Sequence, residues 1–512
     1  MNVLFVSIDS LRRDVLTTYE GPIGFEYDIE TPTLDRFADR ATVFETHYAG
    51  SLPCMPARRE WHAGIQEFLW RPWGPMEPFD DHIATLARDE GVLTALITDH
   101  FHYFQHGAHG YYEDYTVFEF VRGHEYDAWK SAPRDPDQRL LDQTADPATD
   151  PPDGTGYVNR SVYARNAAAR DIEADESNSF AARTFSQAAD WLTENAGAWD
   201  DWFCYVDSFD VHEPFHCPEP YASMYTDEDP RDPDLPVWPY YGPIDEGQSA
   251  LTDRELDFVR SQFAGKTTMT DRWLDELFGV LDERELWDET MVIVTSDHGF
   301  LLGEHGWVGK NHPPVFDILA RTPLMIHYPD DLDGPERVDA LTSAVDLYPT
   351  MLSAMGIDPP TETHGHDLFP LLDGDQESVR ERALYGYWGA SMNVTDGEYT
   401  YLHPTTPGEP AVCHSTAQMN ARGFPMPTRP KPNAEVGSVP YANTPVWTFE
   451  SASHAQNEDP MLFRVDDLEQ ADDLAGADHD AEGRMREELI AGLEELEAPD
   501  REFERLELKG GE

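Results

Sequence analysis

One cysteine lies in a segment whose residue types suggest chemistry. Residues 51–65 are SLPCMPARREWHAGI, so Cys54, Pro56 and Arg58 form the pattern Cys-x-Pro-x-Arg. Proline restricts the backbone of this turn, and the next residues favour a helix that runs from Arg58 and ends at Gly64. Such a helix would hold the Arg58 guanidinium near Cys54 as a fixed charge. Cys54 is then a buried thiol, a metal ligand or a reactive group, and the pattern alone leaves these alternatives open.

Acidic side chains follow two apolar segments that have the pattern of buried strands. Segment 2–8 runs into Asp9, and segment 291–296 runs into Asp297 and His298. Because ligands of open α/β sheets bind beyond the carboxyl ends of the strands, we expect these side chains to share one crevice. Carboxylate oxygens suit a hard cation such as Ca²⁺ or Mg²⁺, and the imidazole also admits Zn²⁺ or Mn²⁺. An aspartate after a strand is also a common helix N-cap, so Asp9 alone is ambiguous.

Histidines follow two further strand-like segments. Segment 92–98 leads into His100 and His102, and segment 202–209 leads into His212. A single histidine in a turn is usually just a solvent-exposed side chain. Two strand ends of this chain carry aspartate, however, and one of them is Asp-His, so four converging strand ends would put several carboxylates and imidazoles in one crevice.

The elements that must position these residues alternate between strands and helices. Short apolar runs predict buried, mostly parallel strands. Helices are expected at 181–196, 252–264, 269–284 and 344–355. The alternation predicts an α/β fold in which a large, mostly parallel, mixed sheet is sandwiched between helices. The pocket walls are expected from the long connections 100–180 and 215–250, which carry several Tyr and Trp residues.

The pattern changes after about residue 375. The segment RALYGYWGASMNVTDGEYTYLHP predicts two antiparallel strands with Asp396 and Gly397 at the turn. A charged helix is expected at 480–497. We therefore expect a catalytic domain at 1–378 and a smaller α+β C-terminal subdomain with an antiparallel sheet at 379–512.

The composition limits the partners of the protein. Among 512 residues, 99 are acidic and 36 are basic, which gives a formal net charge of −63. Such a surface repels nucleic acid and anionic membranes, so neither is an expected partner. Acidic residues spread along the whole chain suggest a halophilic protein, because screening at 1 M salt shortens repulsion to about 3 Å.

The same sequence also predicts where the protein works. No run of 18 apolar residues occurs, and the four cysteines form no CxxC pair. The first apolar run is short and lacks a basic n-region, so it predicts a strand and not a signal peptide. We expect a cytoplasmic protein with free thiols.

Taken together, these segments resemble the sulfatase family of the alkaline-phosphatase-like superfamily. The family signature is C-x-P-S/A-R-x-x-x-x-T-G, and CMPARREWHAG matches it except for Ala63 in place of Thr. Similar segments follow in the family's order: NVLFVSIDSLRRD, FDVHEPF, MVIVTSDHGFLLGEHG and GKNHPPVFDILARTPLMI. The resemblance implies a hydrolase whose substrate is a small-molecule or saccharide sulfate ester.

The resemblance also implies the cofactors and the role of each site residue. Cys54 would be oxidised to formylglycine by a maturation enzyme, and a divalent metal, expected to be Ca²⁺, would activate it. The expected metal ligands are Asp9, Ser10, Cys54, Asp297 and His298. Arg58 would stabilise the nucleophile, and Lys310 would bind a sulfate oxygen. The expected groups around the sulfate and the leaving oxygen are His212, His102 and His100. Lysine is rare in this chain, which favours a function for Lys310.

Two departures from the family pattern keep other functions open. Ser10 replaces the second residue of the usual Asp-Asp pair, so it would bind the metal through its hydroxyl or a water, or the metal would bind more weakly. The segment DHFH replaces the usual Lys-x-His, which leaves His100 as the substitute for the lost cation. One alternative is a phosphonate monoester or phosphodiester hydrolase with the same nucleophile. The other is a non-catalytic protein that binds sulfated ligands.

Overall fold

The core of the protein is a large mixed sheet. The computed structural model describes residues 1–104, 110–130, 138–144, 155–247, 249–329, 334–360, 362–417 and 434–508, with the backbone alone at 155–161. The strand order of the sheet is β12-β2-β11-β8-β1-β6-β4-β5. Strand β11 pairs antiparallel with β8 and β2, and the other neighbours pair parallel. The predicted α/β fold with a mixed sheet is therefore confirmed. Its strands are β1 (Asn2–Ile8), β2 (Thr42–Tyr48), β4 (Leu93–Thr98), β5 (Val117–Phe120), β6 (Trp202–Ser208), β8 (Thr290–Thr295), β11 (Leu324–His327) and β12 (Arg337–Ser343).

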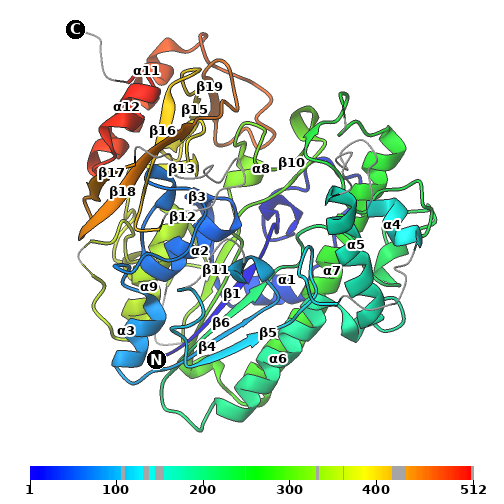
Figure 1. Cartoon of the computed structure of the whole chain (residues 1–512). Helices are drawn as coiled ribbons and strands as arrows, with labels where there is room; N and C mark the ends of the chain where they lie inside the picture. Colours follow the sequence, from blue (N-terminus) through cyan, green and yellow to red (C-terminus); the bar gives the residue numbers. More distant parts are fainter. Residues whose placement is uncertain are drawn as a thin grey trace.

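Helices cover both faces of this sheet (Figure 1). In β1, Leu4 and Val6 join one hydrophobic core, whereas Val3 and Phe5 join the other, as the alternation of a strand requires. The first core lies under α1, α6 and α7, and the second lies under α2, α3 and α9. The helices are α1 (Pro32–Ala38), α2 (Cys54–Ala63), α3 (Ile83–Asp89), α4 (Gln138–Thr144), α5 (Thr155–Arg170), α6 (Phe180–Asn195), α7 (Asp253–Glu283), α8 (Asp317–Ala320), α9 (Leu347–Ala354), α10 (Phe369–Leu372), α11 (His479–Glu495) and α12 (Asp500–Arg505).

The helix α7 is one continuous element, whereas the sequence predicts two helices there. Thr252 and Glu255 form a capping box at its start. The apolar pattern is interrupted near Gly265, where a Cβ would lie 2.3 Å from the carbonyl oxygen of Tyr221. The interruption therefore marks a close backbone approach and not the end of a helix.

The helix α2 also begins earlier than expected. It starts at Cys54 and not at Arg58, with Pro56 in the first turn, where the missing N–H has no helical partner. Gly64 ends the helix in the left-handed conformation, with a φ of 67°, as predicted.

The C-terminal part of the chain adds two smaller sheets. One has the order β19-β15-β14-β13-β3, and the other has the order β16-β18-β17. The expected hairpin turn at Asp396 and Gly397 joins β14 to β15, but the segment forms three strands and not two. Strand β3 precedes Cys54 and belongs to the first of these sheets, where it pairs parallel with β13. The boundary between 1–378 and 379–512 stays a prediction. The strands are β3 (Ser51–Leu52), β13 (Ala383–Tyr387), β14 (Met392–Thr395), β15 (Tyr399–His403), β16 (Pro410–Ser415), β17 (Glu435–Val439), β18 (Ala442–Ala452) and β19 (Met461–Arg464). A further small sheet joins β7 (Gly242–Pro243), β10 (Trp307–Gly309) and β9 (Leu301–Leu302).

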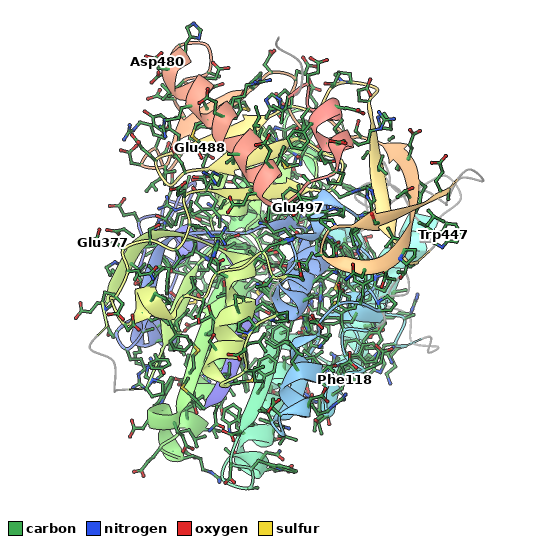
Figure 2. The ribbon with its side chains drawn as sticks, turned by 90° about the vertical axis from the view of Figure 1, so that its left-hand side faces the viewer. Phe118, Glu377, Trp447, Asp480, Glu488 and Glu497 are labelled. Carbon is green, nitrogen blue, oxygen red and sulfur yellow. The ribbon has the colours of Figure 1, made fainter. Side chains whose placement is uncertain are left out.

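Acidic side chains lie on the outer surface of this region. Glu377, Asp480 and Glu497 are exposed, and Figure 2 labels all three, with Asp480 at the start of α11 and Glu497 just beyond its end. In the part of the chain that the structure describes, no helix combines the length and the apolar character that a membrane crossing requires.

Candidate active site

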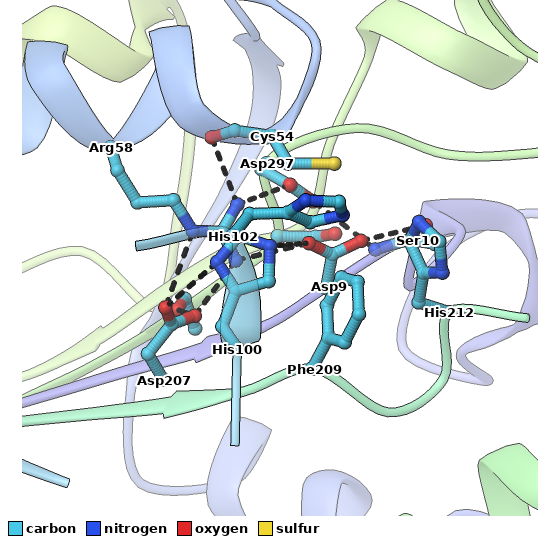
Figure 3. Close-up of polar contacts among 12 residues, drawn as sticks. Asp9, Ser10, Cys54, Arg58, His100, His102, Asp207, Phe209, His212 and Asp297 are labelled. Carbon is cyan, nitrogen blue, oxygen red and sulfur yellow. Dashed lines mark hydrogen bonds and ion pairs between the residues drawn. The ribbon is translucent and has the colours of Figure 1, made fainter. Parts of the chain in front are cut away.

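Three carboxylates meet at the carboxyl edge of the central sheet. Asp9 follows β1, Asp297 follows β8 closely, and Asp207 lies near the end of β6. The register sets them level, because Ser7 of β1 is paired with Asp207 on one side and Thr295 on the other. All three carboxylates are fully buried. The expectation that strand ends converge in one site is thus met (Figure 3).

Four of the predicted metal ligands lie close together. One ligand atom from each of Asp9, Cys54, Asp297 and His298 lies within 4.8 Å of the others. The His298 ring uses Nδ1 for the carbonyl of Gly299, at 2.9 Å, so Nε2 faces the Cys54 Sγ at 3.2 Å. Burial raises the pKa of Asp9 well above its usual value, and the neighbouring Asp297 carboxylate adds to this. A divalent cation would relieve that repulsion, so the donor set fits a metal.

Ser10, the fifth predicted ligand, lies at the edge of this cluster. Its hydroxyl donates to Asp9 Oδ1 at 2.8 Å, and its backbone N–H donates to Asp297 Oδ1 at 3.1 Å. Its backbone is left-handed, with a φ of 61°. Ser10 therefore orients both carboxylates directly, and its hydroxyl also accepts from Lys310 Nζ at 3.3 Å.

Arg58 is surrounded by the three carboxylates. Its Nη2 lies 3.0 Å from Asp9 Oδ2 and 2.7 Å from Asp207 Oδ1, and Nη1 forms an ion pair with Asp297. Nη1 also donates to the carbonyl of Cys54 at 3.0 Å, one turn back along α2. Arg58 thus contacts the backbone of Cys54, and its expected role in stabilising the nucleophile stays a prediction.

Asp207 is a site residue for which no metal-binding or catalytic role is predicted. It accepts hydrogen bonds from the hydroxyls of Ser7, at 2.7 Å, and Tyr103, at 2.9 Å, in addition to Arg58. Its position at a strand end, like that of Asp9, is the signal that could have identified it.

Lys310 lies beside the nucleophile position. Its Nζ is 3.6 Å from Cys54 Sγ and 3.3 Å from His298 Nε2, and the side chain is buried. Burial raises the pKa of the Cys54 thiol well above its usual value, and Asp9 adds to the shift. The thiol is therefore neutral at physiological pH.

A cavity of about 410 Å³ opens onto this cluster. Cys54, Lys310, His102 and His212 line its inner end. Its walls are formed by Pro53, Trp73, Glu125, Tyr126, Glu213, Trp238, Pro239, Tyr240, Tyr241, Asn311 and His312. The predicted wall segments 100–180 and 215–250 supply many of these residues. The others come from elsewhere in the chain: Pro53, Trp73, Glu213 and the 311–312 pair.

Two histidines of the cavity are oriented by neighbouring glutamates and by one aromatic ring. His102 Nε2 lies 3.0 Å from Glu125 Oε2. His212 hydrogen-bonds through Nδ1 to the carbonyl of Glu213, at 2.8 Å. The Phe209 ring lies 4.2 Å from the His212 ring and 5.4 Å from the His102 ring. Glu125 lies in no motif of the sequence, and Phe209 lies in the family-like segment FDVHEPF but has no predicted role.

His100 lies deeper than expected. Its ring nitrogens are 3.8 Å from Asp9 Oδ2 and 3.7 Å from Asp207 Oδ2, beyond hydrogen-bond length. Burial, followed by the charge of Arg58, lowers the pKa of His100 well below its usual value. The ring is thus a neutral group behind the carboxylates, and the cavity lining includes His102 but not His100.

Comparisons with known proteins agree with this geometry. The family model Sulfatase matches residues 1–357. The uncharacterized sulfatase YidJ of Escherichia coli K12 is 27% identical over 393 residues, which cover 72% of this chain and 70% of the relative. The choline-sulfatase of Rhizobium meliloti is 23% identical over 427 residues and 78% of each chain.

A solved structure supports the fold. The phosphonate monoester hydrolase of Agrobacterium radiobacter matches with a TM-score of 0.66 and 21% identity, over 97% of this chain and 96% of that chain. The family model spans the three strand ends, the Cys54 helix and Lys310, which are the parts that build the site. The chain therefore belongs to the sulfatase family and is a hydrolase of that family.

Proposed function

We propose that the protein hydrolyses sulfate monoesters with a formylglycine made from Cys54 and a divalent metal, Ca²⁺. The observation that carries the proposal is the convergence of Asp9, Cys54, Asp297 and His298 beside Lys310, at the inner end of a cavity. The same groups would hold the metal, which would supply Lewis-acid activation of the nucleophile.

The state of Cys54 supports the modification. A catalytic thiol is expected to have a lowered pKa, because the thiolate is the nucleophile. Here burial and Asp9 raise it, so an unmodified Cys54 is a poor nucleophile. Conversion to the hydrated aldehyde replaces this thiol by hydroxyl groups, and it requires a maturation enzyme as partner.

The remaining residues would stabilise charge and move a proton. Lys310 lies where the sulfate meets the nucleophile, so its ammonium would stabilise negative charge that grows in the transition state. His212 presents Nε2 as the nitrogen that can meet a ligand, because Nδ1 is bound to Glu213. We assign His212 as the proton donor to the leaving oxygen, with His102 as its neighbour at the same end of the cavity.

A second candidate is hydrolysis of phosphonate monoesters or phosphodiesters at the same site. Ser10 in place of a second carboxylate favours it, and so does the fold likeness to a phosphonate monoester hydrolase. The named relatives instead include a choline-sulfatase, and that favours sulfate. The aromatic cavity walls suit an aryl or sugar alcohol in either case.

Two measurements test the proposal. Peptide mass spectrometry across 51–65 of protein from its native host should show formylglycine, whereas an unmodified thiol would support a non-catalytic binding protein. A panel of aryl and sugar sulfates, assayed in molar salt with added Ca²⁺, should give turnover. A strong preference for aryl phosphodiesters or phosphonates would overturn the sulfate assignment.

We also propose a cytoplasmic location. All four are buried and free of disulfides, which supports a cytoplasmic protein. Fractionation of the native host tests this, and recovery of activity from the medium would contradict it.

A further inference from the structure

A buried lysine outside the cavity lining contacts the segment that carries His212. Lys266 lies in the middle of α7 and is 1% exposed. Of the three lysines that the structure describes, it is one of two that are buried, and Lys310 of the active site is the other. An ammonium inside a protein is costly unless its N–H groups are all bound, so its three partners are informative.

The three partners are all within five residues of one another. Lys266 Nζ donates to the carbonyl of His212 at 2.7 Å and to the carbonyl of Pro214 at 2.8 Å. It also forms an ion pair with Asp210 Oδ1 at 2.6 Å. An ammonium has three N–H donors, so each has one acceptor on this segment.

These contacts fix the carbonyl groups around the His212 ring. The carbonyls of His212 and Pro214 are bound to Lys266, and the carbonyl between them, that of Glu213, accepts the hydrogen bond from His212 Nδ1. Rotation of the peptide group of His212 or Pro214 would move the Glu213 carbonyl away from the His212 ring. The ammonium therefore controls a hydrogen bond that it does not itself make.

Asp210 fixes the N-terminal end of segment 210–214, which carries His212. Its Oδ1 also contacts His124 Nε2 at 2.8 Å, and its Oδ2 accepts the backbone N–H of Ala181 in the first turn of α6, at 3.1 Å. The next residue, Val211, donates its N–H to the carbonyl of Asp9 at 2.9 Å. The segment is thus tied to α6, to α7 and to the strand end that carries a metal ligand.

We infer that Lys266 is a positioning residue, which with Asp210 fixes the direction in which the His212 imidazole presents Nε2 to the leaving oxygen. The inference rests on the proposed function, in which His212 protonates that oxygen. A donor must lie within hydrogen-bond reach of its target, and a misplacement of 1 Å can cost roughly 10²-fold in rate.

The test uses a series of ring-substituted phenyl sulfates, whose leaving phenols differ in pKa. Loss of a proton donor slows esters of poorly acidic phenols most, so the plot of log kcat/KM against phenol pKa becomes steeper. Lys266→Met should slow phenyl sulfate about 10-fold more than 4-nitrophenyl sulfate. His212→Ala should steepen the same plot further, by about 10²-fold across the series. The double variant should be no steeper than His212→Ala alone.

Two controls separate positioning from stability. Arg505→Met breaks another buried ion pair, with Glu502 in α12, and should lower the melting temperature without changing the slope. If Lys266→Met fails to fold, Asp210→Asn/Lys266→Met removes both charges together and should still steepen the plot.

The outcomes distinguish the two levels of the proposal. A steeper plot for His212→Ala with a wild-type slope for both Lys266 variants would overturn the positioning role and leave the proposed function standing. An unchanged slope for His212→Ala would reject its proton-donor role, and the positioning role with it. Absence of any sulfate turnover by the mature wild-type enzyme would reject the proposed function itself.

Discussion

Two adjacent arginines on α2 build two very different regions. Arg58 and Arg59 are both fully buried, and each is paired with carboxylates. Arg58 points to the strand ends and contacts Asp9, Asp207 and Asp297. Arg59 points away from them, binds Asp80 through two bonds of 2.9 and 2.7 Å, and contacts Glu67 at 3.2 Å.

The difference between the two regions lies in what faces the carboxylates. The Arg59 region is closed by protein, because Arg71 pairs with Glu67 and Glu77, and Glu77 accepts from Ser415 of β16. The Arg58 region reaches the cavity through Cys54, which lines it, and four possible metal-ligand atoms lie within 4.8 Å of one another there. Arginine–carboxylate pairs therefore only stabilise the fold around Arg59, where protein covers them. Around Arg58 the same kind of pair borders the cavity and is available for chemistry.

The largest effect should come from the nucleophile position. Cys54→Ala should lower kcat at least about 10⁴-fold, because the covalent step is lost. The melting temperature should stay close to that of the wild type. Cys204→Ala, in the core of the same sheet, should do the reverse: it leaves a cavity and keeps the activity. Near-normal activity of Cys54→Ala would place the nucleophile elsewhere.

The two arginines offer a matched pair for the next effect. Arg58→Lys should lower kcat/KM about 10²-fold, because lysine cannot make the planar, two-sided contacts that hold the three carboxylates. Arg59→Lys should lower the melting temperature and change kcat/KM by less than about 3-fold. Both variants are measured by thermal unfolding and by initial rates. Equal losses of activity in Arg58→Lys and Arg59→Lys would show that the two regions do not differ in their contribution to catalysis.

Metal binding should affect only the open region. With Ca²⁺ at 100 times its Kd, the wild type should gain about 2.7 kcal/mol in free energy of unfolding over the chelated protein. Asp9→Asn should lose most of this gain, since it removes a charged ligand. Glu67→Gln, in the Arg59 region, should keep it. The measurement is thermal unfolding with and without EGTA, and a full Ca²⁺ response in Asp9→Asn would exclude that aspartate as a ligand.

The closed region should instead determine part of the acid stability. Burial disfavours the charged form of Glu77, but Arg71, Arg59 and two hydroxyl donors lower its pKa from 4.5 to about 2. Because the folded pKa lies below the unfolded one, the contribution is complete above pH 4.5 and is lost as the pH falls toward 2. It amounts to roughly 3 kcal/mol. Glu77→Gln should therefore flatten the melting temperature between pH 5 and 2, whereas the exposed Glu377→Gln should follow the wild type.

Much of the site could be predicted because its residues carry local signals. Asp9 and Asp297 follow apolar strand segments, and parallel strands bring their carboxyl ends to one edge. The Cys-x-Pro-x-Arg pattern and Gly64 likewise indicated a helix at Cys54, although its start was placed four residues late. Glu125 had no such signal, since its contact with His102 depends on which side chains lie across the cavity.

The lysines show most clearly what could not be predicted from the sequence. The scarcity of lysine drew attention to Lys310, and the same argument applies to Lys266, but the sequence contains nothing that links it to His212, 54 residues earlier. Hydrogen bonds from a side chain to distant backbone carbonyls leave no periodic pattern in the chain.

The fold class and the family could be predicted from the amino-acid sequence alone, because strand periodicity and motif order are local properties. Only the tertiary packing shows that Arg58, and not its identical neighbour Arg59, contacts Asp9 and Asp297 beside Cys54. It also decided that His100 lies behind the carboxylates while His102 and His212 face the cavity. The positions of these side chains depend on how helices and loops pack against the sheet, and this packing involves contacts between residues that are far apart in the chain.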